Sequence, residues 1–282
     1  IADREALDAT LDAQKPIACI HMAASCYVGD SVREPDLYWR NNVSATGTLL
    51  AALRSRGINR FVFSSSCSLY APSDRDLHEH APTGPLSPYG RTKLVVEWIL
   101  QDIAATGALN FVALRYFNAA GADPDGEAGE RHDPETHLIP LALDVAAGDR
   151  SELLVFGNSH PTPDGTCIRD YVHVSDIAAA HVLALSHLAR GAPVHWLRVI
   201  DLALEALLLL HVEQDWHAER RPALQGRIWI VLVAPARGLL PGHHTPHVAV
   251  ALGNADVGDA VGNPPVSGGI GRKGRTCSGG EN

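Results

Sequence analysis

In Arg60-Phe61-Val62-Phe63 an arginine leads into a short apolar run, and the stretch lies between two long segments with helical periodicity. The segment before it covers residues 35–57, beginning with a proline and ending with a glycine, and the segment after it covers residues 88–107. Proline favours the first turn of a helix, and glycine favours the residue that ends one. A fully apolar run between two such helices is typical of a strand that is buried on both faces of a sheet.

The same unit of helix followed by strand recurs on either side of this run. A helical pattern over Asp3–Gln14 leads past Pro16 into the apolar run Ile17–Ile20, and the helix over 88–107 leads into Phe111–Leu114. Short apolar strands that alternate with helices of this length predict parallel strands joined by right-handed crossovers. We therefore expect an α/β fold with a doubly wound parallel sheet.

The pattern changes after Asn118, where we expect a smaller α/β lobe. A polar loop over 121–134 precedes a predicted helix over 137–147, a strand over Leu153–Phe156 and a helix over Val174–Leu188. From about residue 194 the apolar periodicity is lost. We expect three regions, which cover residues 1–120, residues 121–193, and an unassigned tail, disordered or aberrant, over 194–282.

The composition is that of a globular protein whose partner is a small molecule. Of the 282 residues, 46% are hydrophobic and 20% are charged, and the 32 acidic residues outnumber the 23 basic ones. No Lys/Arg block occurs, which disfavours nucleic acid and anionic membranes as partners. The longest apolar runs, within 202–212 and 228–236, are shorter than the ~20 residues needed to cross a bilayer.

Five scattered cysteines without a CxxC pair favour neither a disulfide framework nor a cysteine-type zinc site. We therefore expect a cytoplasmic protein. The chain begins with Ile1 and contains no signal-peptide pattern, so we expect that it starts in mid-protein.

The segment that says most about chemistry is Ser87-Pro88-Tyr89-Gly90-Arg91-Thr92-Lys93. Tyr89 and Lys93 are four residues apart at the start of a predicted helix, so their side chains share one face. A nearby cation lowers the pKa of a phenol, which lets tyrosine act as a general base toward a hydroxyl group. A surface Tyr and Lys on a polar face is the alternative, but with six tyrosines and three lysines this spacing is expected only about 0.06 times by chance.

A run of hydroxyl side chains, Ser64-Ser65-Ser66, directly follows the strand at 60–63. In an open α/β sheet the binding site lies outside the carboxyl ends of the strands. We therefore expect Ser66 to share the proton of a substrate hydroxyl with Tyr89. Taken alone, the run would favour a serine-rich loop that caps the strand.

Four motifs occur in order along the chain: Ser64–Ser66, Ser87–Lys93, Arg115–Asn118, and a stretch from Phe156-Gly157 through 161–166 to Arg169-Asp170-Tyr171-x-His173-Val174. In these motifs the chain resembles the UDP-hexose 4-epimerases of the extended short-chain dehydrogenase/reductase family, from residue 1 to about 190. The resemblance implies a Rossmann-like NAD-binding domain over 1–120 and part of a nucleotide-sugar substrate lobe over 121–193. The implied reaction is NAD-dependent epimerisation at C4 of a UDP-hexose (UDP-glucose or UDP-galactose) through a 4-keto intermediate.

The resemblance also implies roles for single residues. Tyr89 would be the base, Lys93 the residue that binds the nicotinamide ribose and tunes the tyrosine, and Ser66 the hydroxyl beside the sugar. The implied NAD contacts are Met22, Ala23, Ala24, Cys26, Asn41, Ser64, Tyr89, Lys93 and Phe117. The implied substrate contacts are Ser66, Cys67, Ser68, Tyr89, Asn118, His137, Leu138, Val155, Phe156 and Gly157 in a strand under the uracil, and Arg169 on the diphosphate. A homodimer through the two long helices is implied as well, and a metal is not.

The chain departs from the family pattern at both ends. No glycine-rich βα turn precedes the strand at 17–20, and residues beyond about 193 do not match the family. We therefore expect the 282-residue chain to bind NAD weakly, to expose apolar faces of the strands at 17–20 and 60–63, and to be poorly soluble. An inactive fragment of such an enzyme stays an alternative. So does a related nucleotide-sugar 4,6-dehydratase, although Cys67 and Ser68 stand where that enzyme carries an Asp-Glu pair.

Three other patterns carry less weight. Residues 269–274 have the form GxGxxG, but no strand precedes them and only eight residues follow, so we assign them no cofactor. His243, His244 and His247 lack carboxylate or cysteine partners for a metal nearby in the sequence. We expect His173 to be packed or hydrogen-bonded, and the two histidines at 78 and 80 to lie in a polar loop.

Overall fold

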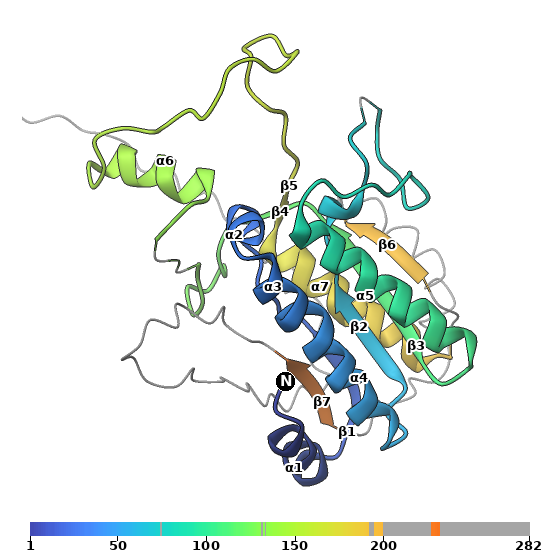
Figure 1. The fold of residues 1–282 in the computed structure, drawn as a ribbon. Coiled ribbons are helices and arrows are strands. Elements are labelled where there is room, and N and C mark those ends of the chain that lie inside the picture. The colour runs from blue at the N-terminus through green and yellow to red at the C-terminus, as the bar shows by residue number, and fades with distance from the viewer. Residues whose placement is uncertain (74, 131, 133, 192–194, 200–226, 232–282) are drawn as a thin grey trace, which may run out of the picture.

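The computed structural model describes residues 1–73, 75–130, 132, 134–191, 195–199 and 227–231. Its centre is a five-stranded, wholly parallel sheet in the order β6-β3-β2-β1-β7 (Figure 1). The three strands predicted from the sequence occupy the three central positions, which confirms the doubly wound α/β class. The strands are β1 (Pro16–His21), β2 (Arg60–Ser64), β3 (Asn110–Tyr116), β6 (His195–Val199) and β7 (Arg227–Val231).

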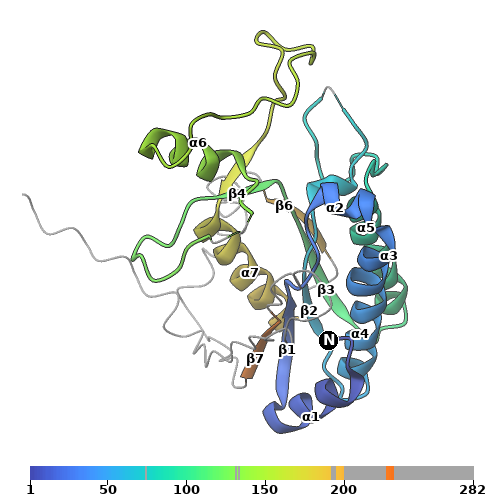
Figure 2. The same ribbon diagram turned by 60° about the vertical axis from the view of Figure 1, so that its left-hand side comes forward.

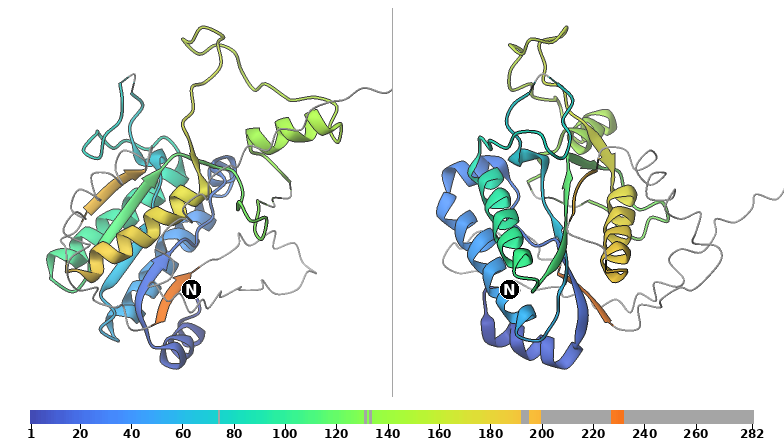
Figure 3. Two further views of the ribbon diagram at one scale, coloured as in Figure 1. Left: turned by 180° about the vertical axis from the view of Figure 1, so that it is seen from behind. Right: turned by 90° about the vertical axis from the view of Figure 1, so that its right-hand side faces the viewer.

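Helices cover both faces of this sheet, as Figures 2 and 3 show. On one face lie α1 (Arg4–Gln14), α4 (Ala45–Arg54) and α5 (Pro88–Ala105), where buried leucines and phenylalanines form one core cluster. On the other face lies α7 (Val174–Ala189), whose apolar residues form a second cluster with β1, β2 and β3. Each fully buried side chain of this kind contributes about 1.5–3 kcal/mol.

The segment predicted as one helix over 35–57 is interrupted. It consists of α3 (Pro35–Tyr38), a π-helical stretch (Trp39–Ser44) and α4, and the short α2 (Val28–Arg33) precedes it. Single π-helical turns inside helices are frequent at functional sites because they re-aim side chains. Here the π-helical stretch carries the asparagines at 41 and 42.

Two expectations about the sheet are wrong. The helix over 174–188, which we assigned to the second lobe, packs on the central sheet, because its buried residues face β2 and β3. The strands at 17–20 and 60–63 do not expose broad apolar faces: Ile20 is 4% exposed and Phe61 is fully buried. The two helical layers account for this burial, and β7 pairs with the outer edge of β1.

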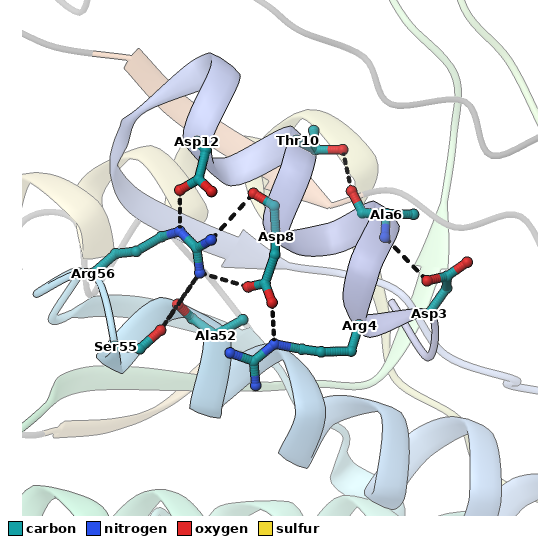
Figure 4. A network of polar contacts seen from close by, with 9 residues as sticks. All are labelled: Asp3, Arg4, Ala6, Asp8, Thr10, Asp12, Ala52, Ser55 and Arg56. Atoms are coloured by element: carbon teal, nitrogen blue, oxygen red, sulfur yellow. Dashed lines mark hydrogen bonds and ion pairs between the residues drawn. The ribbon is translucent and has the colours of Figure 1, made fainter.

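An ion-pair network joins α1 to the end of α4 (Figure 4). The Arg56 guanidinium donates to the carboxylates of Asp8 at 2.6 Å and Asp12 at 2.7 Å, and Arg4 donates to Asp8 at 2.7 Å. The side-chain hydrogen bonds from Arg4 and Arg56 lower the pKa of Asp8. Asp3 accepts from the backbone N–H of residue 6 and so caps the first turn of α1.

The remaining described segments form a loosely covered second lobe. A two-stranded parallel sheet joins β4 (Asn118–Ala120) to β5 (Tyr171–His173), and α6 (Leu138–Ala147) has no buried residue among those described. The helix predicted over 137–147 is confirmed. The strand predicted over Leu153–Phe156 is wrong, because the segment is exposed and pairs with no described strand, and an apolar run alone does not supply a partner. Among the described residues no helix is both long and apolar enough to span a bilayer.

Candidate active site

The polar segments predicted to form the site meet at the carboxyl edge of the central sheet. The chain leaves β1 through residues 22–26, β2 through residues 64–66 and β3 through residues 117–118. The first turn of α5 brings Tyr89 to the same edge. This is the position in which open parallel sheets bind ligands.

Tyr89 and Lys93 are held in place by the start of α5. Ser87 caps the helix by accepting from the Gly90 N–H at 3.1 Å, and a proline occupies the first helical position. The Lys93 ammonium is buried, lies 5.8 Å from the centroid of the Tyr89 ring, and donates to the Ser64 carbonyl at 2.7 Å. The predicted sharing of one helix face by Tyr89 and Lys93 is thus confirmed.

The pKa values of this pair are set by burial. Burial lowers the pKa of Lys93 to about 8, while Glu97 opposes that shift. Burial raises the pKa of Tyr89, the neighbouring Tyr116 adds to the rise, and a hydrogen bond from Ser66 opposes it. The lowered pKa that we expected for Tyr89 is not found, since desolvation of the phenolate raises it.

A close approach of two backbones brings Ser66 to Tyr89. Ser66 begins a 3₁₀ turn (Cys67–Leu69), and its hydroxyl accepts from the Ser68 N–H at 3.1 Å. A Cβ atom added to Gly90 would lie 2.3 Å from the Ser68 carbonyl oxygen, so only glycine lets α5 pack this closely against the turn. Burial raises the pKa of Cys67, in the same turn, to about 11.

The loop after β1 is pinned to α5 by a residue that the sequence analysis did not single out. Asn42 is buried, accepts from the Ser25 N–H at 2.8 Å, and donates to the Ser25 carbonyl at 2.9 Å and the Thr92 hydroxyl at 3.2 Å. The predicted cofactor residue Asn41 donates to the Ser25 hydroxyl at 2.9 Å. These bonds fix residues 22–26 beside the helix that carries Tyr89.

A buried ion pair supports the serine run from beneath. The Arg115 guanidinium donates twice to the Glu97 carboxylate, at 3.0 and 2.5 Å, and Ser65 donates to the same carboxylate at 2.5 Å. Arg115 also donates to the Tyr70 hydroxyl at 3.1 Å. Sequence reasoning missed this network. A charged residue next to the apolar run 111–114 was the available signal, since buried charges are rare without partners.

Two buried histidines lie within the sheet and its helical layers. His181 on α7 makes a 2.8 Å hydrogen bond to the Ser64 hydroxyl and a 2.7 Å hydrogen bond to the carbonyl of residue 177. Burial lowers its pKa, although the bond to that carbonyl opposes the shift. His21 at the end of β1 bonds to the Thr46 hydroxyl at 2.9 Å, and burial lowers its pKa to about 3.

The predicted substrate residues fall into a group near Tyr89 and a group farther out. Ser66, Cys67 and Ser68 form the turn against α5, and Asn118 on β4 donates to the Asp170 carbonyl at 2.8 Å. Arg169 is close enough to Cys67 to lower its pKa by charge. His137 and Leu138 start α6, and Val155, Phe156 and Gly157 lie in the exposed segment that forms no strand. The GxGxxG at 269–274 and the histidines at 243–247 lie outside the described residues.

The sheet order and the polar edge with its tyrosine, serine and lysine define an α/β protein of the Rossmann-like class. The chain belongs to the NAD dependent epimerase/dehydratase family, whose sequence pattern matches residues 1–198. The resemblance inferred from the sequence is thereby confirmed.

Relatives of known name place the chain more closely within this family. It is 52% identical over 192 residues to a UDP-glucose 4-epimerase of Rhizobium leguminosarum bv. trifolii, covering 68% of this chain and 59% of the relative. It is 50% identical over 192 residues to that of Rhizobium meliloti (strain 1021), covering 68% and 58%. The chain therefore spans less than two thirds of the length of these relatives.

Solved structures agree with this placement. UDP-glucose 4-epimerase from Brucella ovis in complex with NAD is 51% identical, with a TM-score of 0.67 over 70% of this chain and 61% of that chain. The enzyme from Stenotrophomonas maltophila, with bound NAD and formylated UDP-arabinopyranose, is 39% identical, with a TM-score of 0.67 over 82% and 68%.

Proposed function

We propose that the whole protein is an NAD-dependent UDP-hexose 4-epimerase, an isomerase that interconverts UDP-glucose and UDP-galactose through a 4-keto sugar. The observation that carries this proposal is the group formed by Tyr89, Ser66 and Lys93 at the carboxyl edge of the sheet. The relatives of the same name supply the substrate class.

Tyr89 is the proton acceptor in this proposal. Its hydroxyl takes the proton of the sugar 4-hydroxyl while Ser66, already hydrogen-bonded to it, orients the pair. Lys93 holds a buried positive charge one helical turn away, and such a charge favours the phenolate against the opposing effect of burial. The same phenol returns the proton after the 4-keto sugar has rotated to present its other face, so the two half-reactions use one set of residues.

The residues around this group fit the nicotinamide end of NAD. The candidates are the loop after β1, where Asn42 fixes the backbone, together with the Ser64 carbonyl, Lys93 and Phe117. When bound, NAD would supply the acceptor for the hydride that leaves C4 of the sugar, and a positive charge on its nicotinamide ring that favours the Tyr89 phenolate. Within the described residues no glycine-rich turn leads from a strand of this sheet into a helix N-terminus, so the pyrophosphate has no evident holder there. The proposed NAD contacts in full are Met22, Ala23, Ala24, Cys26, Asn41, Ser64, Tyr89, Lys93 and Phe117.

For the substrate we propose a path from the catalytic turn to the second lobe. Asn118 and the turn at 66–68 lie nearest the sugar, and Arg169 suits the diphosphate because a guanidinium matches phosphate oxygens. His137, Leu138 and the segment 155–157 belong to the uridine side. We retain a cofactor domain and a substrate lobe as part of this proposal. We assign α7 to the cofactor domain because it packs on the central sheet, and also β6 and β7, which pair within that sheet although they fall in the predicted tail.

The test is turnover of UDP-galactose by the complete protein and its Tyr89→Phe variant. Loss of the general base, with the ring's packing kept, is expected to lower kcat by about 10²–10⁴-fold. Lys93→Met is the second variant and Lys15→Met its control, because Lys15 lies at the exposed end of α1. A Tyr89→Phe protein with nearly full turnover would refute the assignment.

Two alternatives predict other outcomes in the same assay. A 4,6-dehydratase would release water from the sugar, but the Cys67 thiol, with a pKa raised to about 11, is poorly suited to acid/base work near neutral pH. The inactive-fragment alternative predicts no turnover by the 282-residue chain when it is assayed beside the active complete protein.

We further propose that the protein forms a homodimer in the cytoplasm. Trp98 on α5 is 52% exposed and Trp39, beside α3, is 36% exposed, and aromatic side chains are enriched in interfaces. The four described cysteines are free thiols, which fits a reducing compartment. In a sedimentation experiment we expect the parent protein to behave as a dimer and Trp98→Asp to behave as a monomer.

A further inference from the structure

A compact group of four metal-ligating side chains lies in the loop before α6. The side chains are those of Glu130, His132, Glu135 and His137, and one ligand atom from each lies within 4.8 Å of all the others. The reaction proposed above uses none of these four as an acid, base or nucleophile. Of the four, only His137 is also a proposed substrate contact, on the uridine side.

The distances within the group are those of a nearly closed cluster. His137 Nδ1 lies 2.8 Å from a Glu130 carboxylate oxygen and 2.9 Å from one of Glu135. His132 Nδ1 lies 2.8 Å from Glu130 and 3.6 Å from Glu135. Both imidazoles therefore present the same ring nitrogen to the same two carboxylates.

We propose that these four residues bind one divalent transition-metal ion, Zn²⁺ being the best fit. Tetrahedral zinc with bonds of about 2.1 Å places its ligand atoms roughly 3.4 Å apart. The spacings in the group range from 2.8 Å to no more than 4.8 Å, so they need to change by at most about 1.4 Å. Two imidazole nitrogens with two carboxylate oxygens suit zinc and its neighbours in the transition series, whereas Mg²⁺ and Ca²⁺ prefer oxygen ligands alone.

His137 Nδ1 forms an ordinary 2.9 Å hydrogen bond with Glu135, so it is His132 that distinguishes a metal site from a simple pair of His–Glu ion pairs. His132 Nδ1 is buried and makes no hydrogen bond to any described residue, because its 2.8 Å contact with Glu130 lacks hydrogen-bond geometry. Glu135 is held in place by the backbone N–H groups of Thr136 and His137, which donate to one of its oxygens at 2.7 and 2.8 Å. Supporting hydrogen bonds of this kind fix the orientation of a metal ligand.

The position of the group indicates a structural role. Four protein ligands fill a tetrahedral site and leave no place for water or substrate, as in structural zinc centres. The two imidazole rings pack on Tyr27, with ring centroids 5.9 and 6.5 Å away. Tyr27 follows Cys26 in the loop after β1, so the metal would join the start of α6 to the loop proposed to contact the nicotinamide.

The experiment is calorimetric titration of ZnCl₂ into the metal-free full chain in which His243, His244 and His247 are replaced by alanine. That background removes the other histidine group in the sequence. We expect one zinc per chain, at least tenfold weaker binding in His132→Ala and in Glu135→Gln, and no change in His160→Ala, an exposed histidine outside the group. Co²⁺ should give the intense visible absorption of a tetrahedral site, and MgCl₂ should not compete.

Three results would overturn the proposal. The first is absence of zinc binding in the alanine background, and the second is binding that His132→Ala and Glu135→Gln leave unchanged. The third is equal competition by Mg²⁺, which would mean a patch of negative charge only. Circular dichroism of each variant verifies folding, and the cobalt spectrum of Glu135→Gln gives a readout that does not depend on affinity.

Discussion

Replacing Glu97 by glutamine should destabilise the protein by more than any single surface change. Glu97 is fully buried, the Arg115 side chain is 6% exposed, and the two are joined by two charge-assisted hydrogen bonds. Glutamine keeps the volume of the side chain but removes its charge. The guanidinium then stays buried without a counter-ion, which is the costly outcome for a buried pair.

The expected loss is about 3–5 kcal/mol, the range for removing one partner of a buried ion pair. A domain with a total stability of about 5–15 kcal/mol would lose a third or more of it. Ser65 would lose its charged acceptor at the same time. Because Ser66 is the next residue, we also expect slower turnover in the complete protein.

Urea unfolding followed by circular dichroism measures the change, with an unchanged slope as the sign that only stability has altered. Glu97→Leu, Arg115→Leu and the double variant Glu97→Leu/Arg115→Leu form a mutant cycle, in which the double variant should be more stable than Glu97→Leu alone because no charge is left unpaired. Arg4→Gln is the control, since it breaks the exposed pair with Asp8 and should cost far less. A Glu97→Gln loss below about 1 kcal/mol would refute the reasoning that this buried pair supports the site.

Three further predictions concern other parts of the site. Gly90→Ala should lower turnover of the complete protein by about 10²-fold, because the added Cβ meets the Ser68 carbonyl and separates Ser66 from Tyr89. Gly47→Ala is the control, because a Cβ at that position meets open space and turnover should not change. Equal activity of the two variants would contradict the argument that only glycine permits this close approach. Burial lowers the pKa of His21 from 6.5 to about 3, so His21 takes up a proton on unfolding below pH 6.5. The free energy of unfolding, measured in urea, should therefore fall by about 2 kcal/mol between about pH 7 and pH 5. The fall should be smaller in His21→Gln, which lacks the titrating group. Calorimetric titration of NAD into the 282-residue chain should give weak binding, since the described residues hold no pyrophosphate turn, and micromolar affinity would show that the main anchor lies elsewhere.

The sequence was sufficient for the parts of the fold that depend on local pattern. β1, predicted over 17–20, spans Pro16–His21, and α6, predicted over 137–147, spans Leu138–Ala147. The predicted strand over 153–156 failed because an apolar run does not reveal whether a neighbouring strand exists. The helix at 174–188 was found but placed in the wrong lobe, since an amphipathic pattern specifies a buried face and not the surface that buries it.

The same distinction separates the site residues that could be predicted from those that could not. Tyr89 and Lys93 share one turn of a helix, so their spacing carries the information. The supporting bonds join residues far apart in sequence: 50 positions between Asn42 and Thr92, and 117 between Ser64 and His181. In the sequence, a polar residue within an apolar pattern is the only indication of such a hydrogen bond, and it does not identify the bonding partner.

These long-range bonds determine how the site is built. The loop after β1 is fixed by Asn42, the serine run by Glu97 with Arg115, and Lys93 by the Ser64 carbonyl. Each anchor lies among the three central strands and the helices that cover them, and none involves the second lobe. The geometry of the proton-transfer group is therefore specified by β1, β2, β3, α5 and the π-helical stretch that carries Asn42. Substrate preference would then depend on the second lobe, where the residues assigned to the uridine side are exposed, and changes there should alter KM more than kcat.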